Sequence, residues 1–311
     1  MKCLVTGATG FIGRVLCCEL LAQGDEVVAF SRHGHDVVPG LVSVAVDLAV
    51  EEVPAEYLAG VDTVFHLAGI AHQSASADQY DAVNHCAPLR LARSAQALGV
   101  KHFLFLSSVK AMGPASSDTA RSELDCTEPA DPYGRSKLQA EDALRNEFAA
   151  SSMSLAIIRP ALVYGEHVKG NMQRLASAVR QGLPRPPVGG RRSMIAVQDL
   201  ATLLRHVARS DRPGVNTWIA CGAGSYSTQQ IYQMMRSALG LSPGPSLLPR
   251  WCWRLGGGLL DRLRGNSGES TYKKLFGAEL YSNQRIVADT GWKPEARLED
   301  IIPMIMREAK P

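Results

Sequence analysis

The chain of 311 residues has no large charge excess, no long apolar run, no internal repeat and no cysteine spacing typical of a metal site. Its net charge of +3 and its scattered basic residues argue against a nucleic-acid partner. The N-terminus turns glycine-rich within a few residues, so we expect neither a signal peptide nor a membrane-spanning helix. The seven cysteines are odd in number, which favours a reducing, cytoplasmic location without disulfides or a bound metal.

An ordinary apolar content of 46% predicts a compact globular core. One segment, residues 251–263, is apolar and amphipathic enough to touch a membrane surface. Packing against the core or against another subunit is the favoured interpretation of this segment.

The first informative pattern is a strand, a glycine turn and a helix at the N-terminus. The strand predicted for residues 2–6 leads directly into a G-x-x-G-x-x-G sequence, and helical periodicity follows. Glycines in this position permit a tight turn and let the backbone approach a pyrophosphate, whereas the alternative is a turn without a ligand. The residues expected to bind a dinucleotide here are Gly7, Gly10, Phe11, Ile12 and Gly13.

The end of the second predicted strand, residues 26–30, bears on which dinucleotide is bound. An NAD site usually has an acidic residue there, but this chain has Ser31 and Arg32. Arg32 can pair with a 2′-phosphate, so the sequence favours NADP, with NAD as the alternative if Arg32 only stacks on the adenine.

Three further predicted strands end in residues suited to a ligand. The strand over residues 41–46 ends at Asp47 and Leu48, where a carboxylate could meet the adenine or simply lie in a surface turn. The strand over residues 61–67 ends in small residues that let the backbone lie against a flat ligand, namely Leu67, Ala68 and Gly69. After a helix over residues 77–98 that contains Asn84, the strand over 103–106 ends at Ser107 and Ser108, facing the crevice of a parallel sheet.

Tyr133 and Lys137 stand four residues apart at the start of a long predicted helix, so both side chains leave one face. A nearby ammonium favours the phenolate and lowers the pKa of a tyrosine, with a positive cofactor ring adding to the effect. An exposed tyrosine and a solvated lysine on an ordinary helix are the alternative, and only the surrounding motifs favour chemistry.

Beyond the strand predicted for residues 154–158 the alternation of strand and helix loosens, which indicates a second lobe. We expect a dinucleotide-binding domain over 1–163 and about 191–212, and a substrate lobe over about 164–190 and 213–311. The expected elements of the C-terminal half are a helix over 171–181, a strand over 191–197, a helix capped by Asp199, a strand over 215–220 and a helix over 300–308.

Alternating strands and helices imply an α/β fold with a Rossmann doubly wound parallel sheet and a smaller, mainly helical C-terminal lobe. With the glycine motif, His66 to Gly69, Asn84, the Tyr133 and Lys137 pair and Arg159-Pro160 in order, the chain resembles the extended short-chain dehydrogenase/reductase family of the NAD-dependent epimerase/dehydratase type. The resemblance covers nearly the whole chain. It implies that Tyr133 exchanges the proton, that Lys137 lowers the pKa of Tyr133 and holds the nicotinamide ribose, and that Ser108 is the third catalytic residue.

Within the family the nucleotide-sugar branch matches best, and it implies a UDP-sugar substrate. Asn171 and Arg192 resemble the residues of that branch that bind the diphosphate, and Ser107 would lie beside Ser108 at the sugar. Short segments around these residues resemble a bacterial subgroup that acts on UDP-4-keto-6-deoxy-N-acetylhexosamines in O-antigen and surface-polysaccharide synthesis. The usual Val-Tyr-Gly of that subgroup is Ala111-Met112-Gly113 here, which leaves the sugar contacts open.

The leading hypothesis is a reductase that uses NADPH at C4 of a UDP-4-keto-sugar, and the second is a UDP-hexose 4-epimerase with bound NAD. A dehydratase is disfavoured, because Val109 and Lys110 replace the Asp-Glu pair that would follow the active-site hydroxyl. A nucleotide-sensing binding protein without catalysis is the alternative from another class. The resemblance also implies a homodimer through the helices over 77–98 and 132–150.

Overall fold

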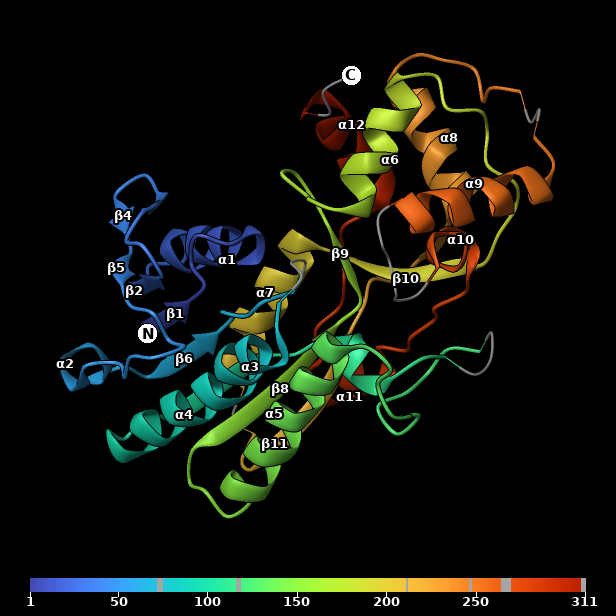
Figure 1. Cartoon of the computed structure of the whole chain (residues 1–311). Helices are drawn as coiled ribbons and strands as arrows, with labels where there is room; N and C mark the ends of the chain where they lie inside the picture. The colour runs from blue at the N-terminus through green and yellow to red at the C-terminus, as the bar shows by residue number, and fades with distance from the viewer. Residues whose placement is uncertain (72–74, 116–118, 211, 246–247, 264–269, 309–311) are drawn as a thin grey trace.

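The computed structural model describes residues 1–71, 75–115, 119–210, 212–245, 248–263 and 270–308. The described residues form two lobes, with the N-terminal half around a large sheet and most of the last third gathered into a smaller helical lobe (Figure 1).

The large sheet has seven parallel strands in the order β11-β8-β7-β6-β1-β2-β5. Its order reverses at β1, so the carboxyl ends of β1 and β6 border the crevice where such sheets bind ligands. The strands are β1 (Lys2–Thr6), β2 (Glu26–Ser31), β5 (Val44–Ala45), β6 (Thr63–His66), β7 (His102–Leu106), β8 (Ser154–Pro160) and β11 (Val215–Ala220).

Helices cover both faces of this sheet, and each face has its own apolar cluster. On one face Leu16 and Leu20 of α1 pack with Leu200 and Leu204 of α7 and with Trp218. The other cluster joins the strands to α2, α4 and α5. The helices are α1 (Phe11–Ala22), α2 (Ala55–Leu58), α4 (Ala87–Ala97), α5 (Pro132–Phe148), α7 (Val197–Ala208) and α11 (Gln284–Thr290). The prediction of a doubly wound parallel sheet is confirmed.

The smaller lobe is built on a three-stranded sheet of order β12-β10-β9. A separate cluster of apolar side chains, including Tyr232 and Ile302, joins this sheet to three helices. The elements of this lobe are β9 (Leu162–Tyr164), β10 (Arg191–Ala196), β12 (Ser225–Ser227), α6 (Asn171–Arg180), α8 (Thr228–Ala238), α9 (Arg250–Leu263), α10 (Thr271–Phe276) and α12 (Leu298–Glu308).

Several predicted boundaries differ from the structure. The strand predicted over 41–46 is divided into β4 (Leu41–Val42) and β5, and β4 forms a small hairpin with β3 (Asp36–Val38). The helix predicted over 77–98 contains a π-helical turn, because α3 (Ala77–Tyr80) continues into η1 (Asp81–Cys86) before α4.

Two tertiary contacts also differ from the prediction. β11 pairs with β8, so residues 215–220 complete the large sheet rather than belonging to the substrate lobe. Asp199 does not cap a helix, because α7 begins at Val197 and the Asp199 carboxylate accepts hydrogen bonds from the backbone N–H groups of Glu295 and Ala296. A sequence pattern does not reveal these long-range partners.

The apolar segment predicted over 251–263 is helix α9. The ring of Trp253 packs edge-on against Phe276 of α10, with the ring centroids 5.9 Å apart. Trp251 and Leu255 lie on its outer face and are 63% and 65% exposed. None of the described helices is long and apolar enough to cross a membrane.

Candidate active site

The glycine turn between β1 and α1 has the close backbone approach that the sequence predicted. Gly7 adopts φ = +68°, and a Cβ atom on it would lie 2.8 Å from the backbone N of Ala68. A Cβ atom on Gly13 would lie 2.2 Å from the carbonyl oxygen of Gly7. Since neither position has room for a side chain, the turn can hold β1, β6 and α1 together only with glycine.

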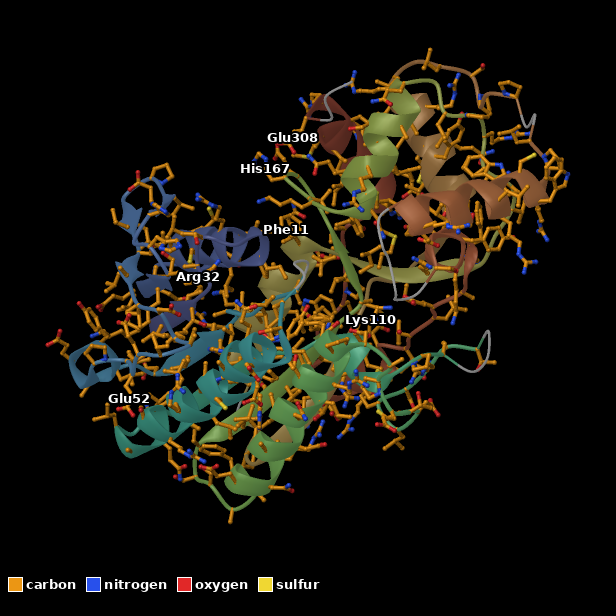
Figure 2. All side chains as sticks on the ribbon, viewed as in Figure 1. Phe11, Arg32, Glu52, Lys110, His167 and Glu308 are labelled. Atoms are coloured by element: carbon orange, nitrogen blue, oxygen red, sulfur yellow. The ribbon has the colours of Figure 1, made fainter. Side chains whose placement is uncertain are left out.

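The N-terminus of α1 offers free backbone donors. Its N-cap residue Gly10 has no side chain to cap the helix, and the first turn carries no acidic residue. Such a terminus suits a pyrophosphate. The side chains of Phe11 and Ile12 pack into the two neighbouring apolar clusters, so these residues would contribute through their backbone. Figure 2 shows Phe11 at the junction of the lobes.

The end of β2 differs in detail from the prediction. The Ser31 hydroxyl is buried, lies 2.7 Å from the Ser43 hydroxyl and accepts a hydrogen bond from the N–H of Gly34. Arg32 is exposed at the strand end and has no hydrogen bond or ion pair to the described residues (Figure 2). Arg32 is therefore the side chain that remains able to meet a ligand phosphate.

Asp47 and Leu48 follow β5 in a turn. The Asp47 carboxylate accepts a hydrogen bond of 3.0 Å from the N–H of Ala49, and the Leu48 carbonyl accepts one of 2.6 Å from Arg90. The Leu48 side chain lies in the apolar core. The carboxylate stabilises its own turn, and a role at the adenine stays a prediction.

The residues after β6 connect the glycine turn to the Lys137 helix. The Thr6 hydroxyl lies 3.0 Å from Nδ1 of the buried His66 and accepts a hydrogen bond from the N–H of Ala68. Leu67 packs against the core beside α1. A Cβ atom on Gly69 would lie 3.2 Å from the Lys137 ammonium. The strand end predicted to face the cofactor thus lies directly against the predicted catalytic lysine.

Ser108, Tyr133 and Lys137 are brought together from β7 and α5. Asp131 caps α5 by accepting a hydrogen bond from the N–H of Gly134, which fixes the helix start beside Tyr133. Burial raises the pKa of Tyr133 to about 12, against the lowering effect of a hydrogen bond with Ser108. The sequence argument expected Lys137 to lower this pKa, but the lysine does not offset burial.

The Lys137 ammonium is buried and donates a hydrogen bond of 2.9 Å to the carbonyl of Leu106. Burial lowers the pKa of Lys137 to about 8, while the charge of Glu141 acts to raise it. The ammonium is fixed by the end of β7 and lies close to Gly69. It therefore reaches from α5 to the carboxyl ends of β6 and β7.

Sequence reasoning missed a buried ionic group below this site. Glu141 is fully buried, accepts a hydrogen bond of 2.5 Å from the Ser107 hydroxyl and pairs with Arg159 at 2.6 Å and with Arg145 at 2.5 Å. Ser107 was predicted to contact the substrate, but its hydroxyl is buried and engaged with Glu141. The signal was present, since Tyr133, Lys137 and Glu141 follow one another at one-turn spacing.

The two predicted diphosphate ligands lie in the smaller lobe. Asn171 is exposed at the start of α6. Arg192 on β10 donates hydrogen bonds to the carbonyls of Lys273 and Gly277, so its guanidinium is held against α10. Nearby, the Lys110 ammonium lies 3.0 Å from Oε1 of Glu279 and joins the two lobes, a contact that sequence reasoning did not find.

The described residues fit a nicotinamide dinucleotide, since the glycine turn excludes side chains and the α1 terminus is uncapped. A model of the NAD dependent epimerase/dehydratase family matches residues 3–220. The chain belongs to this family. The predictions of an extended short-chain dehydrogenase/reductase of the nucleotide-sugar branch, of an enzyme and of a nicotinamide cofactor are confirmed.

Two relatives of this chain are named nucleotide-sugar enzymes. It is 29% identical over 311 residues to UDP-glucose 4-epimerase of Vibrio cholerae, covering 96% of this chain and 92% of the relative. It is 32% identical over 243 residues to dTDP-6-deoxy-L-talose 4-dehydrogenase (NAD(P)(+)) of Kitasatospora kifunensis, covering 72% of this chain and 74% of the relative.

A similar solved structure is MoeE5 in complex with UDP-glucose and NAD. It superposes on this chain with a TM-score of 0.78 at 24% sequence identity. The superposition covers 99% of this chain and 98% of MoeE5. At this identity the likeness supports the fold, including the two-lobe arrangement.

Proposed function

We propose that this enzyme transfers a hydride at C4 of a UDP-sugar, and that it reduces a UDP-4-keto-6-deoxy-N-acetylhexosamine with NADPH. The observation that carries the proposal is the contact of Tyr133 with Ser108 beside a buried Lys137 that lies against Gly69. The 4-dehydrogenase relative supports chemistry at C4 of a 6-deoxy sugar. NADPH is supported by the exposed Arg32, which replaces the usual acidic residue.

In this proposal the bound cofactor supplies the hydride that reduces the C4 carbonyl. Tyr133 donates its proton to the oxygen as charge develops there, and Ser108 donates a hydrogen bond to the same oxygen. The raised pKa of Tyr133 keeps the phenol protonated before the reaction, which suits a proton donor. Lys137 holds the nicotinamide ribose and favours the phenolate that forms.

The substrate contacts belong to the same proposal. Asn171 and Arg192 would hold the diphosphate, which requires the Arg192 guanidinium to serve a ligand in addition to the backbone carbonyls of α10. Val109 and Lys110 stand where a dehydratase would have its acidic pair, and the Lys110 ammonium is paired with Glu279, so proton abstraction at C5 has no base in this position.

A 4-epimerase with retained NAD is the second candidate, favoured by the relative from Vibrio cholerae that covers nearly the whole chain. The same three residues would act in both directions, with Tyr133 first accepting and then returning the C4 hydroxyl proton. The candidates differ in the fate of the keto-sugar. In an epimerase it is an intermediate that rotates within the site and is reduced again, whereas in a reductase it is the substrate that enters from solution.

The deciding experiment supplies purified protein with NADPH and a UDP-4-keto-6-deoxy-N-acetylhexosamine, and in parallel with UDP-glucose alone. Oxidation of NADPH with formation of the C4 hydroxyl sugar is the expected result. Interconversion of UDP-glucose and UDP-galactose without added cofactor, and without NADPH oxidation in the first assay, would replace the reductase by the epimerase. Inactivity in both assays would reject both assignments.

Three further features complete the proposal. A homodimer through α4 and α5 is expected from the family resemblance and is testable by light scattering. A cytoplasmic location agrees with the free cysteines of the described residues. A role in O-antigen or surface-polysaccharide synthesis follows from the proposed substrate class.

A further inference from the structure

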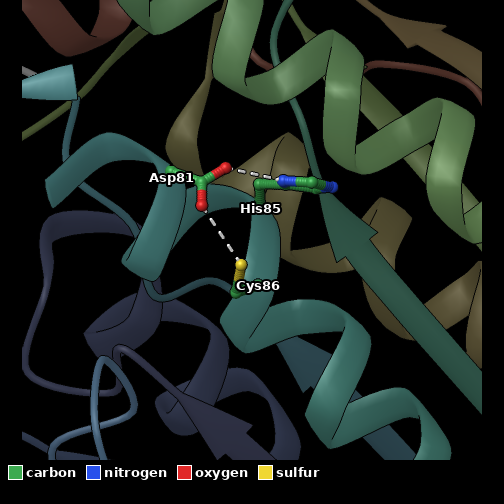
Figure 3. A group of neighbouring side chains, drawn as sticks. All are labelled: Asp81, His85 and Cys86. Atoms are coloured by element: carbon green, nitrogen blue, oxygen red, sulfur yellow. Dashed lines mark hydrogen bonds and ion pairs between the residues drawn. The ribbon is translucent and has the colours of Figure 1, made fainter. Parts of the chain in front are cut away.

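The π-helical turn η1 brings three metal-binding residue types together on its outer side. Oδ1 of Asp81 lies 2.8 Å from Nδ1 of His85, and Oδ2 of Asp81 lies 3.3 Å from the Cys86 sulfur (Figure 3). One ligand atom from each residue lies within 4.8 Å of the other two. None of these residues belongs to the catalytic or cofactor-binding set.

The backbone geometry of the turn is what gathers these side chains. In a regular α-helix residues five apart point about 140° away from each other, so Asp81 and Cys86 would not share a face. The wider π-turn, with its i→i+5 hydrogen bonds, places them side by side. The same turn carries Asn84, which is buried and hydrogen-bonded to Ile70 and to Ser136 beside Tyr133.

We propose that Asp81, His85 and Cys86 form a binding site for one soft divalent cation, for which Zn²⁺ is the best match. Carboxylate oxygen, imidazole nitrogen and thiolate sulfur are all zinc ligands, and tetrahedral coordination separates such atoms by about 3.3–3.6 Å. The distances of 2.8 and 3.3 Å involve different oxygens of the Asp81 carboxylate, and one ligand atom from each residue lies within 4.8 Å of the others, so a small side-chain adjustment brings the three atoms to that spacing.

The three side chains offer charges that suit a divalent ion. Zinc takes carboxylate, thiolate and neutral imidazole ligands, so binding would replace the Cys86 thiol proton by the metal and release that proton to solvent. The bound ion would then face two negative ligands and one neutral ligand.

Positive charge also lies near the site. Arg90 and Arg93 follow Cys86 by four and seven residues, on α4. Arg90 donates to the carbonyl of Leu48, and Arg93 forms a two-pronged ion pair with Glu147. Both guanidinium groups therefore have partners outside the proposed site.

A second group of three, Glu166, His167 and Glu308, is the natural comparison. It offers two carboxylates and an imidazole but no sulfur. His167 lies in the left-handed region at φ = +64°, and its side chain is 77% exposed. This group joins the turn that follows β9 to the end of α12 and lacks the soft ligand.

The test uses full-length protein treated with a chelator and then titrated with Zn²⁺ alone against a chromophoric competitor. We expect one equivalent to bind, with a matching rise in melting temperature. Because removing even an indirect partner of a ligand costs about 10–100-fold in metal affinity, Cys86→Ser and His85→Ala should each lose more than about 100-fold. Cobalt(II) in place of zinc should show thiolate charge-transfer absorption that Cys86→Ser lacks.

Two controls make the result decisive. Cys18→Ser removes an exposed cysteine on α1 outside the group and should bind Zn²⁺ as the parent protein does. Asp81→Asn keeps the side-chain shape and should weaken binding without loss of helical content. The proposal fails if the parent protein binds no Zn²⁺, if Cys86→Ser binds it unchanged, or if His167→Ala abolishes binding in place of His85→Ala.

Discussion

The Ser107 hydroxyl donates a buried 2.5 Å hydrogen bond to Glu141, directly after β7 and next to the serine that contacts Tyr133. Glu141 lies one helical turn beyond Lys137 on α5, and its other partners are Arg145 and Arg159. The strand end that presents Ser108 and the helix that presents Tyr133 are therefore joined below the site by one carboxylate.

Replacing Glu141 by Gln should destabilise the protein more than any surface charge change on the same helix. Breaking a buried pair leaves the Arg159 guanidinium uncompensated, which costs about 3–5 kcal/mol of unfolding free energy. The matched control is Glu147→Gln, since Glu147 pairs with the 59% exposed Arg93 and should cost less than about 1 kcal/mol. Urea unfolding measures both, and equal losses would contradict the assignment.

Replacing Tyr133 by Phe keeps the ring beside Tyr80, 6.5 Å away between centroids, and removes only the proton donor. We expect kcat to fall by about 10²–10⁴-fold with cofactor affinity unchanged. Tyr57→Phe, which alters a tyrosine on α2, should keep full activity. Stopped assays and cofactor titration give both numbers, and full activity in the Tyr133 variant would remove the proposed proton transfer.

Arg32→Ala tests the cofactor preference. If the guanidinium pairs with a 2′-phosphate, its loss should raise KM for NADPH by about 10–100-fold, since hydrogen bonds to charged groups contribute about 1.5–3 kcal/mol. KM for NADH should not change. Arg93→Ala removes an exposed arginine that is paired with Glu147 and should leave both constants unaltered. An equal rise in KM for NADPH and NADH would show that Arg32 does not bind the 2′-phosphate.

Gly7→Ala tests the close approach between the glycine turn and β6. Both Gly7 and Gly24 adopt positive φ, +68° and +75°. Alanine at either position would carry the strain of a left-handed backbone conformation, about 1–2 kcal/mol. Only at Gly7 does the new Cβ meet another backbone, 2.8 Å from the N of Ala68. Gly7→Ala should therefore lower cofactor affinity as well as stability, whereas Gly24→Ala should lower stability alone in thermal and binding measurements.

His66 makes stability depend on pH. Burial first, and then the charge of Lys137, lowers the pKa of His66 to about 3, whereas the unfolded chain has the ordinary value of 6.5. Between these values the unfolded state binds the additional proton, so the free energy of unfolding should fall by about 1.4 kcal/mol per pH unit below pH 6.5. Denaturant unfolding from pH 7 to 5 should show this slope, and His66→Gln should reduce it. An unchanged slope in the variant would assign the acid sensitivity to other groups.

Local patterns were sufficient for the fold and for much of the site. The glycine spacing predicted the turn of Gly7, and the four-residue spacing predicted that Tyr133 and Lys137 share a face, because both are short-range backbone effects. The engagement of Ser107 with Glu141 could not be predicted in this way, since it depends on a partner 34 residues away. The π-turn at Asp81 was also missed, because its residues have ordinary helical periodicity and the wider turn surrounds the buried Asn84.

The strand β11 has a consequence for how the chain folds during synthesis. β11 is the edge strand beside β8, yet β9, α6, β10 and α7 lie between them in the chain. An N-terminal fragment that ends before residue 213 would expose the whole length of β8 as an unpaired edge, which is a template for aggregation. The order of the sheet therefore makes completion of the nucleotide half wait for the first part of the smaller lobe to leave the ribosome.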